Sequence, residues 1–368
     1  MKKFFLLAVT VVYLQTSFAQ MDLPPSGGNP RAKITEEVGI TDITLSYSRP
    51  DVSGREGKIW GGLVTYGFTT QSFITNKNTS PWRAGANENT TITFEHDVKV
   101  EGKDLKAGTY ALFMAVWPEK ATLIFSNQSN AWGSFYYEDK YDALRVDVKP
   151  VALDKNVEWL KYEFIEQKEK SCTIALEWEK LMIPFKVDVD VDNIVINRLR
   201  EQVTSQKGFN QLNLVAAANY CLNKNINLDE ALSWAQRASA FKSYATLRTL
   251  ATAYEKLNRL KEADSVMTEA LAMATVNQCI GYGRTLITQK RNDRALEVLL
   301  AAKTRFGDVA VVDNGLMYGY SAKGDFKNAL VYADKALAQT PKDNDTAKKA
   351  LEGQIAKLKE QKDINASN

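Results

Sequence analysis

The sequence predicts two domains of different class: an all-β, sandwich-like domain, followed by an all-α array of helical repeats. Two observations carry this prediction. From about Arg31 to Val191, apolar and polar residues alternate with a period of two, which is typical of strands with one buried face. After Asp192 the apolar spacing becomes helical, and alanines recur at nearly constant intervals. A chain of 368 residues is long enough for two such domains.

The segment 1–19 is typical of a secretory signal peptide. Two lysines precede a short apolar run, and Ser17 and Ala19 supply the small residues expected before a cleavage site. A membrane-spanning helix needs roughly 20 apolar residues, so this run is too short to be an anchor. Residues 20–30 are rich in proline and glycine and are expected to form a flexible leader. We therefore expect an exported protein, either periplasmic or secreted.

The β-domain is assigned to residues 31–191, because about nine or ten short alternating segments are separated by turn-forming residues. The alternation is clear in 91–98, in 172–178 and in 181–191. The segment 110–117 is apolar on both parities, as expected for a central strand that is covered on both faces. Short strands in this number predict a β-sandwich.

The helical region is assigned to residues 192–341 and contains four segments that can be superimposed. Each segment places an alanine at the expected tight contact between helices, at Ala231, Ala263, Ala295 and Ala329. The steps of 32, 32 and 34 residues are close to the roughly 34-residue period of tetratricopeptide repeats. Residues 342–368 are expected to form a capping helix and a tail, because one apolar stripe is surrounded by charged residues.

The composition argues against several kinds of chemistry. The net charge of +3 gives no electrostatic footprint for nucleic acid, and no segment after the signal is apolar enough to span a membrane. Metal sites and proton shuttles usually need histidine or cysteine, whereas this chain has one histidine and three scattered cysteines. We therefore expect no cofactor and no metal.

The histidine and the cysteines are assigned structural roles. His96 falls on the apolar parity of the predicted strand 91–98. Cys172, Cys221 and Cys279 are odd in number and widely spaced, which favours three buried thiols. A disulfide between Cys221 and Cys279 is the alternative.

An alternating run of acids follows the last predicted strand and imitates the start of a calcium-binding loop. It consists of Asp188, Asp190 and Asp192. The glycine and the glutamate that such a loop requires are replaced by Asn193 and Leu199, so no calcium site is predicted. We expect instead that Asp192 caps the N-terminus of the first helix.

The long connection between Ser48 and Thr90 concentrates cations, aromatic residues and glycines. Connections of this length often carry binding groups. Guanidinium groups suit a carboxylate or a phosphate, and tryptophan rings suit a sugar or an aromatic group. The candidate ligand-binding residues are Arg49, Arg55, Trp60, Trp82, Arg83 and Asn87. The alternative interpretation is an ordered loop, held by buried tryptophans and by hydrogen bonds from arginine to the backbone.

The acids of this connection that could act as a catalytic pair are Asp51 and Glu88. Glycoside hydrolysis needs two carboxyl groups roughly 5–10 Å apart. Each acid is also explained as the salt-bridge partner of Arg49, Arg55 or Arg83. A carboxylate-dependent glycan hydrolase is therefore kept as the alternative function.

Several spaced motifs of the β-domain together resemble a family of exported bacterial proteins known as domain of unknown function 2911. The motifs are Tyr47-Ser48-Arg49-Pro50, Gly54-Arg55, Ile59-Trp60-Gly61-Gly62-Leu63-Val64, Tyr66-Gly67, Trp82-Arg83-Ala84-Gly85-Ala86-Asn87-Glu88 and Leu105-Lys106-Ala107-Gly108-Thr109-Tyr110. The resemblance covers about residues 28–185, and it implies tetratricopeptide-like repeats after the β-domain, but no known activity. This chain departs from the family pattern by an insertion at 68–81 between the Tyr-Gly and Trp-Arg motifs.

These observations favour a binding or scaffold protein over an enzyme. We expect the β-domain to bind a small molecule or a glycan through the loop of arginines and tryptophans. We expect the helical repeats to present a concave face to a peptide or to a partner protein, because stacked repeats leave one long groove.

Overall fold

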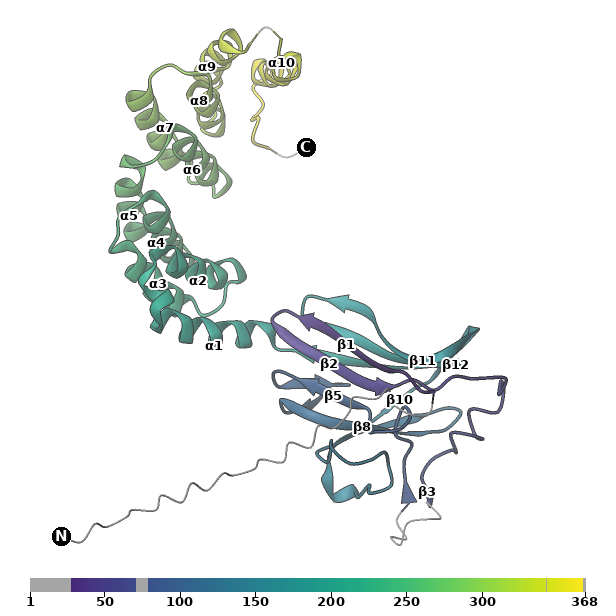
Figure 1. The fold of residues 1–368 in the computed structure, drawn as a ribbon. Coiled ribbons are helices and arrows are strands. Elements are labelled where there is room, and N and C mark those ends of the chain that lie inside the picture. The colour runs from purple at the N-terminus through teal and green to yellow at the C-terminus, as the bar shows by residue number, and fades with distance from the viewer. Residues whose placement is uncertain (1–27, 71–78, 342, 367–368) are drawn as a thin grey trace, which may run out of the picture. The chain divides into compact units, whose positions relative to one another are not determined.

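The computed structural model describes residues 28–70, 79–341 and 343–366. The predicted signal peptide and most of the predicted leader lie outside these residues. The chain divides into two compact units, of which one ends at Asn197 and the other begins at Arg198. The first unit is built of strands and the second of helices (Figure 1). Within the described ranges, no helix is long and apolar enough to cross a membrane.

The first unit is a β-sandwich, as predicted. Its six-stranded antiparallel sheet has the order β1-β2-β5-β8-β9-β10, with β1 Arg31–Val38, β2 Thr41–Ser48, β5 Thr91–Phe94, β8 Gly108–Val116, β9 Ala121–Ser126 and β10 Asp142–Val148. The four-stranded antiparallel sheet has the order β11-β12-β6-β7, with β11 Val151–Lys168, β12 Ser171–Val189, β6 Val98–Val100 and β7 Lys103–Leu105. A short ribbon pairs β3 (Thr69–Thr70) with β4 (Thr79–Ser80) inside the insertion, whose residues 71–78 lie outside the described ranges.

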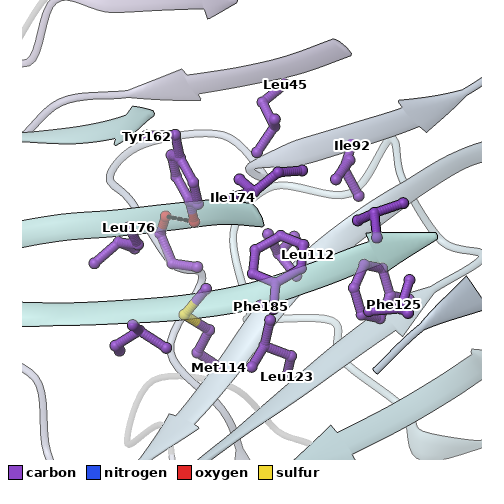
Figure 2. Packing of buried hydrophobic residues seen from close by; sticks show 14 of the residues in the cluster. Leu45, Ile92, Leu112, Met114, Leu123, Phe125, Tyr162, Ile174, Leu176 and Phe185 are labelled. Atoms are coloured by element: carbon purple, nitrogen blue, oxygen red, sulfur yellow. Dashed lines mark hydrogen bonds between the residues drawn. The ribbon is translucent and has the colours of Figure 1, made fainter. Parts of the chain in front are cut away.

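The core of the sandwich lies between these two sheets. Side chains of β8 and β9, among them Leu112 and Phe125, face Ile174 and Phe185 of β12 (Figure 2). The rings of Phe125 and Phe185 meet edge to face, with centroids 6.2 Å apart. Burying each large apolar side chain contributes about 1.5–3 kcal/mol. The alternation seen in the sequence is therefore the pattern of residues that fill this interface.

A β-bulge joins two of the predicted strands into one. The segments 172–178 and 181–191 were expected to be separate, but β12 runs without a break from Ser171 to Val189. Glu179 has a positive φ of 52°, and the pairing of β12 with β11 shifts at this residue. One extra residue changes the apolar parity from even numbers to odd ones, so both halves of the strand face the same core.

The assignment of His96 to an apolar strand face is wrong. Strand β5 ends at Phe94, and His96 lies in the turn before β6. Its Nδ1 lies 3.1 Å from the Thr41 hydroxyl, and the ring is half-buried. The Glu95 N–H still donates to the Asp42 carbonyl at 3.1 Å, but the ladder goes no further, because the Asp42 N–H donates to the Glu95 carboxylate instead of to a backbone carbonyl.

The N-cap of the first helix is Asp190, and the prediction of Asp192 is wrong. Helix α1 (Val191–Thr204) begins directly after β12, so Asp190 is the residue that precedes its first turn. The Asp190 carboxylate accepts a hydrogen bond from the Asn193 N–H at 3.4 Å. Asp192 lies inside the first turn and pairs with Lys170. A carboxylate at either position is favourable, because helix N-termini attract negative charge.

The second unit is an array of antiparallel helix pairs. The pairs are α2 (Gln211–Lys224) with α3 (Leu228–Ser239), α4 (Tyr244–Lys256) with α5 (Leu260–Ala272), α6 (Val276–Thr288) with α7 (Asn292–Phe306), and α8 (Ala310–Ala322) with α9 (Phe326–Gln339). The alanines at 231, 263, 295 and 329 are each the fourth residue of the second helix of a pair, and all four are fully buried. The predicted repeat is therefore confirmed, and a small residue is needed where two helices cross closely.

The capping helix α10 (Asp345–Lys359) follows the last pair. Leu351, Ile355 and Leu358 are buried against α9, as their predicted stripe requires. The first helices of the pairs, from α2 to α8, lie along the inner side of the curved array (Figure 1). We refer to α2, α4, α6 and α8 as the inner row.

The three cysteines are buried and free, which confirms the prediction of buried thiols; the alternative disulfide between Cys221 and Cys279 is not formed. Burial raises the pKa of Cys172 to about 12 and also raises the pKa of Cys221 and of Cys279. Nucleophilic cysteine chemistry needs the thiolate, so these thiols are suited to packing rather than to catalysis.

The N-terminus of α4 is closed by a capping box. The Ser243 hydroxyl accepts from the Thr246 N–H at 3.2 Å, and the Thr246 hydroxyl accepts from the Ser243 N–H at 3.1 Å. We expect Ser243→Ala to lower the free energy of unfolding of the helical unit by about 1 kcal/mol, because a helix N–H loses its partner. Denaturant titration measures this change. Ser265→Ala on the exposed face of α5 is the matched control and should stay within about 0.5 kcal/mol of the parent.

Candidate functional site

The three arginines of the predicted loop donate to carbonyl groups of the domain. Arg49 Nε donates to the Leu160 carbonyl at 2.8 Å, and Arg55 donates to two carbonyls of its own turn, each at 2.8 Å. Arg83 Nη1 donates to the Asn87 carbonyl at 2.7 Å. Burial lowers the pKa of Arg83. These bonds fix the course of the loop, because each one ties an arginine side chain to a backbone carbonyl.

The tryptophans of the loop pack against one another and against the core. The ring of Trp60 lies 5.7 Å from Trp82 and 5.9 Å from Trp178 of β12, in both cases edge to face. Trp82 stacks on Trp178 at 6.0 Å and donates through Nε1 to the Gly85 carbonyl. The structure thus brings Trp60 and Trp82 together, and Arg83 with Asn87. This arrangement supports the alternative interpretation of an ordered loop, while ligand binding by these residues stays a prediction.

The two candidate catalytic acids belong to separate networks. Asp51 pairs with Arg55, with 3.2 Å between carboxylate oxygen and guanidinium nitrogen, as its interpretation as a salt-bridge partner predicted. Glu88 accepts from the Ser48 hydroxyl at 3.1 Å and lies 3.8 Å from the guanidinium of Arg31, which was not one of its three predicted partners. Each carboxylate is thus paired with a different cation, and nothing in this geometry supports a shared catalytic role.

A polar pocket lies beside this loop, on the face of the six-stranded sheet opposite to the sandwich core. We call it the Arg145 pocket. It has a volume of about 320 Å³ and is lined by Phe68, Thr79, Tyr137, Glu138, Asp139 and Arg145. Tyr137 anchors it by packing edge to face on Phe113 of β8, at 5.3 Å between ring centroids. Phe68 and Thr79 come from the insertion, so the departure from the family pattern helps to build this pocket.

A buried network holds the floor of the Arg145 pocket. Asp142 Oδ2 accepts from the Tyr137 hydroxyl at 2.7 Å and from Arg145 Nε at 2.6 Å. Arg145 Nη2 in turn donates to the Tyr137 oxygen at 2.7 Å. Burial raises the pKa of Asp142 and raises that of Tyr137 well above its ordinary value, so the phenol stays a neutral donor. The network fixes the guanidinium of Arg145 in one orientation.

Sequence reasoning missed Tyr137, Asp142 and Arg145. The connection from β9 to β10, residues 127–141, is also long and rich in aromatic and acidic residues. The length and composition that drew attention to the loop after Ser48 were therefore present here too. The insertion at 68–81 and the connection at 127–141 come together on the face of the six-stranded sheet opposite to the sandwich core. The sequence does not show this contact.

The inner row of the helical unit carries a repeated contact between arginine and tyrosine. The Arg248 guanidinium of α4 lies over the Tyr282 ring of α6 at 5.0 Å, and Arg284 of α6 lies over the Tyr318 ring of α8 at 4.3 Å. Gln354 of α10 donates to the Tyr318 hydroxyl. Burial raises the pKa of Tyr282 to about 12. Successive helices of the inner row are thus joined by charged and aromatic side chains.

Across the described ranges, no group of three or more histidine, cysteine or acidic side chains is placed to hold a metal ion.

Comparison with known proteins gives a family and a set of similar structures. Residues 29–187 match the model of the family described as protein of unknown function DUF2911. No curated protein matches this chain.

The solved structures that are similar to the chain include tetratricopeptide-repeat (TPR) proteins. YrrB, described as a TPR protein with an unusual peptide-binding site, has a TM-score of 0.29 and 16% identity, with 44% of this chain and 89% of that one covered. TTC0263, a thermophilic TPR protein of Thermus thermophilus, has a TM-score of 0.30 and 20% identity, over 44% and 88%. The match to the APC/C hetero-tetramer Cut9-Hcn1 has a TM-score of 0.30 and 17% identity and covers 45% of this chain, but only 33% of that chain. Residues 29–187 of this chain are thus similar to the DUF2911 family, and tetratricopeptide-like helical repeats follow that domain.

Proposed function

We propose that the protein is an exported binding protein without catalytic activity, and that its inner row binds an extended segment of a partner protein. The observation that carries this proposal is the row of arginine–tyrosine contacts from α4 to α8. Stacked helix pairs leave their first helices along one continuous surface, and such arrays generally serve as interaction surfaces. Export is the part of the proposal that depends on the predicted signal peptide alone.

The solvent-facing positions of α6 support this surface. They are Asn277, Gly281, Arg284 and Thr288, spaced four, three and four residues apart. This spacing forms one polar stripe along the helix. Asparagine and threonine side chains can bond to the backbone of an extended peptide. Gly281, in the middle of the stripe, leaves space for a partner. A Cβ added to this glycine would have no other atom within 4 Å.

The chemistry of the stripe favours a partner segment with acidic side chains. Arg284 is exposed, and its guanidinium lies over the Tyr318 ring at 4.3 Å from the ring centroid. An arginine that stacks in this way keeps its N–H edge available for a carboxylate. We therefore propose a segment that carries at least one aspartate or glutamate. The alternative of a glycan hydrolase through Asp51 and Glu88 receives no such support, because each acid is paired within its own network.

The test begins with partner capture from the exported fraction and continues with a synthetic peptide of the captured segment. We expect Arg284→Ala to weaken the binding of this peptide about tenfold, because a charge-assisted hydrogen bond contributes roughly 1.5–3 kcal/mol. Fluorescence polarisation of the labelled peptide measures this. Lys261→Ala on α5, outside the inner row, removes an exposed cation and is the matched control. Equal binding by the Arg284→Ala variant and the parent would refute the inner row as the binding surface.

A further inference from the structure

The Arg145 pocket has the construction of a ligand site rather than of a gap between loops. Its lining combines hydrogen-bond donors and acceptors with two aromatic rings: Phe68, Thr79, Tyr137, Glu138, Asp139 and Arg145. Its volume of about 320 Å³ falls within the range of small-molecule sites. The polar groups come from three separate parts of the chain, namely β4, the segment before β10, and β10 itself. Their convergence on one cavity therefore depends on the fold.

Burying the hydrogen-bond network below the pocket costs free energy. We infer that this network has a role besides filling space in the fold. The Asp142 side chain is only 8% exposed, and its Oδ1 is buried without a hydrogen-bond partner among the described residues. A buried polar atom without a partner destabilises the folded state. The network holds Arg145 in a fixed position. The Arg145 side chain is 42% exposed and borders the cavity.

We propose that the Arg145 pocket binds one neutral sugar unit of a glycan. Arg145 presents its remaining N–H donors to the cavity, while Glu138 and Asp139 present acceptors. A neutral sugar offers hydroxyl groups that donate and accept at once, so it matches both sets. The Phe68 ring supplies an apolar wall, and the Arg145 guanidinium lies over one face of this ring, 5.7 Å from its centroid. The uncovered part of the ring suits the C–H groups of a sugar.

The charges at the pocket argue against an anionic ligand. An anion would meet Glu138 and Asp139, while the Arg145 guanidinium is already paired with Asp142. Glu138 is balanced by Lys140, at 2.7 Å between carboxylate oxygen and ammonium nitrogen, so the mouth carries little net charge. Exposed aromatic rings lie on the same segment: Trp132 and Tyr136 are 55% and 61% exposed. Rings of this kind could stack on further sugars of a chain, as aromatic side chains do with flat apolar faces.

This inference does not rest on the proposed function, because the Arg145 pocket belongs to the β-domain and the inner row to the helical unit. The test uses the full chain with its natural domains. The probes are glucose, galactose, mannose, N-acetylglucosamine and their short oligomers, with glucuronic acid and glucosamine as charged counterparts. Saturation-transfer NMR identifies bound sugars, and calorimetry measures their affinities.

The expected result is saturable binding of at least one neutral sugar, and weaker binding of its charged counterpart. Asp139→Asn and Glu138→Gln should each weaken binding about tenfold, because both acids line the cavity and a hydrogen bond to a charged group is stronger than one to a neutral group. Asp154→Asn, an exposed acid on β11 in the other sheet, should leave binding unchanged. The inference is overturned if no neutral sugar binds, if glucuronic acid or glucosamine binds better than the neutral sugars, or if both lining variants bind as the parent does.

Discussion

Replacing Arg145 by alanine is expected to lower the free energy of unfolding of the β-domain by about 3 kcal/mol. The reason is the Asp142 carboxylate, which is 8% exposed and would lose its cation. Breaking a buried pair by removing one partner typically costs about 3–5 kcal/mol, and the lower end applies because Arg145 itself is 42% exposed. Denaturant titration of the parent and the variant measures the change.

A second variant and a second pH separate this electrostatic cost from lost packing. The double variant Arg145→Ala with Asp142→Asn should recover a large part of the loss, because no uncompensated charge remains. Burial raises the pKa of Asp142 even with Arg145 present. An acid whose pKa is raised by folding stabilises the folded state when protonated, and this contribution is lost as pH rises through the folded pKa. The loss of unfolding free energy caused by Arg145→Ala should therefore become smaller as the pH is lowered from 7 towards 4. A cost that is the same at both pH values would mean that lost packing dominates.

The parts of the fold that the sequence predicts are those set by side-chain spacing alone. The recurring alanines locate the crossing of each helix pair, because a larger side chain at Ala231 or Ala295 would separate the helices. The parity change within β12 was also visible in the sequence, as a switch from even to odd apolar positions after Trp178. It was interpreted as two strands, whereas a switch without a turn-forming residue indicates a bulge such as the one at Glu179.

The candidate sites were harder to predict, because they depend on partners that are distant in the chain. Arg49 bonds to the carbonyl of Leu160, which is 111 residues away. The same arginine pattern would suit a ligand or a neighbouring strand, so composition cannot distinguish the two. The Arg145 pocket was missed for the same reason, since Phe68 and Arg145 meet only in the folded domain.

Leu299→Ala is expected to lower the free energy of unfolding of the helical unit by about 2–5 kcal/mol. Leu299 lies in α7, is fully buried, and is inserted between glycines of α6 and α8. A Cβ on Gly283 or on Gly319 would come within 2.7 Å of one of its methyl carbons. The helices can approach this closely because glycine has no side chain, so the leucine fills the space between three helices. Its removal leaves a cavity that the tightly packed backbones cannot close.

The position of Leu299 in the array should also change how the unit unfolds. Repeat arrays are stabilised by contacts between neighbouring helices, so a defect in the middle weakens the coupling of the two halves. A matched control is Leu358→Ala, which removes an equally buried leucine from the terminal helix α10. Hydrogen exchange should then show earlier opening from α6 to α8 in the Leu299 variant, and only in α10 in the Leu358 variant. Leu299→Met should cost less than about 1.5 kcal/mol, because it conserves volume. A loss below about 1 kcal/mol for Leu299→Ala would contradict the close packing of α6, α7 and α8.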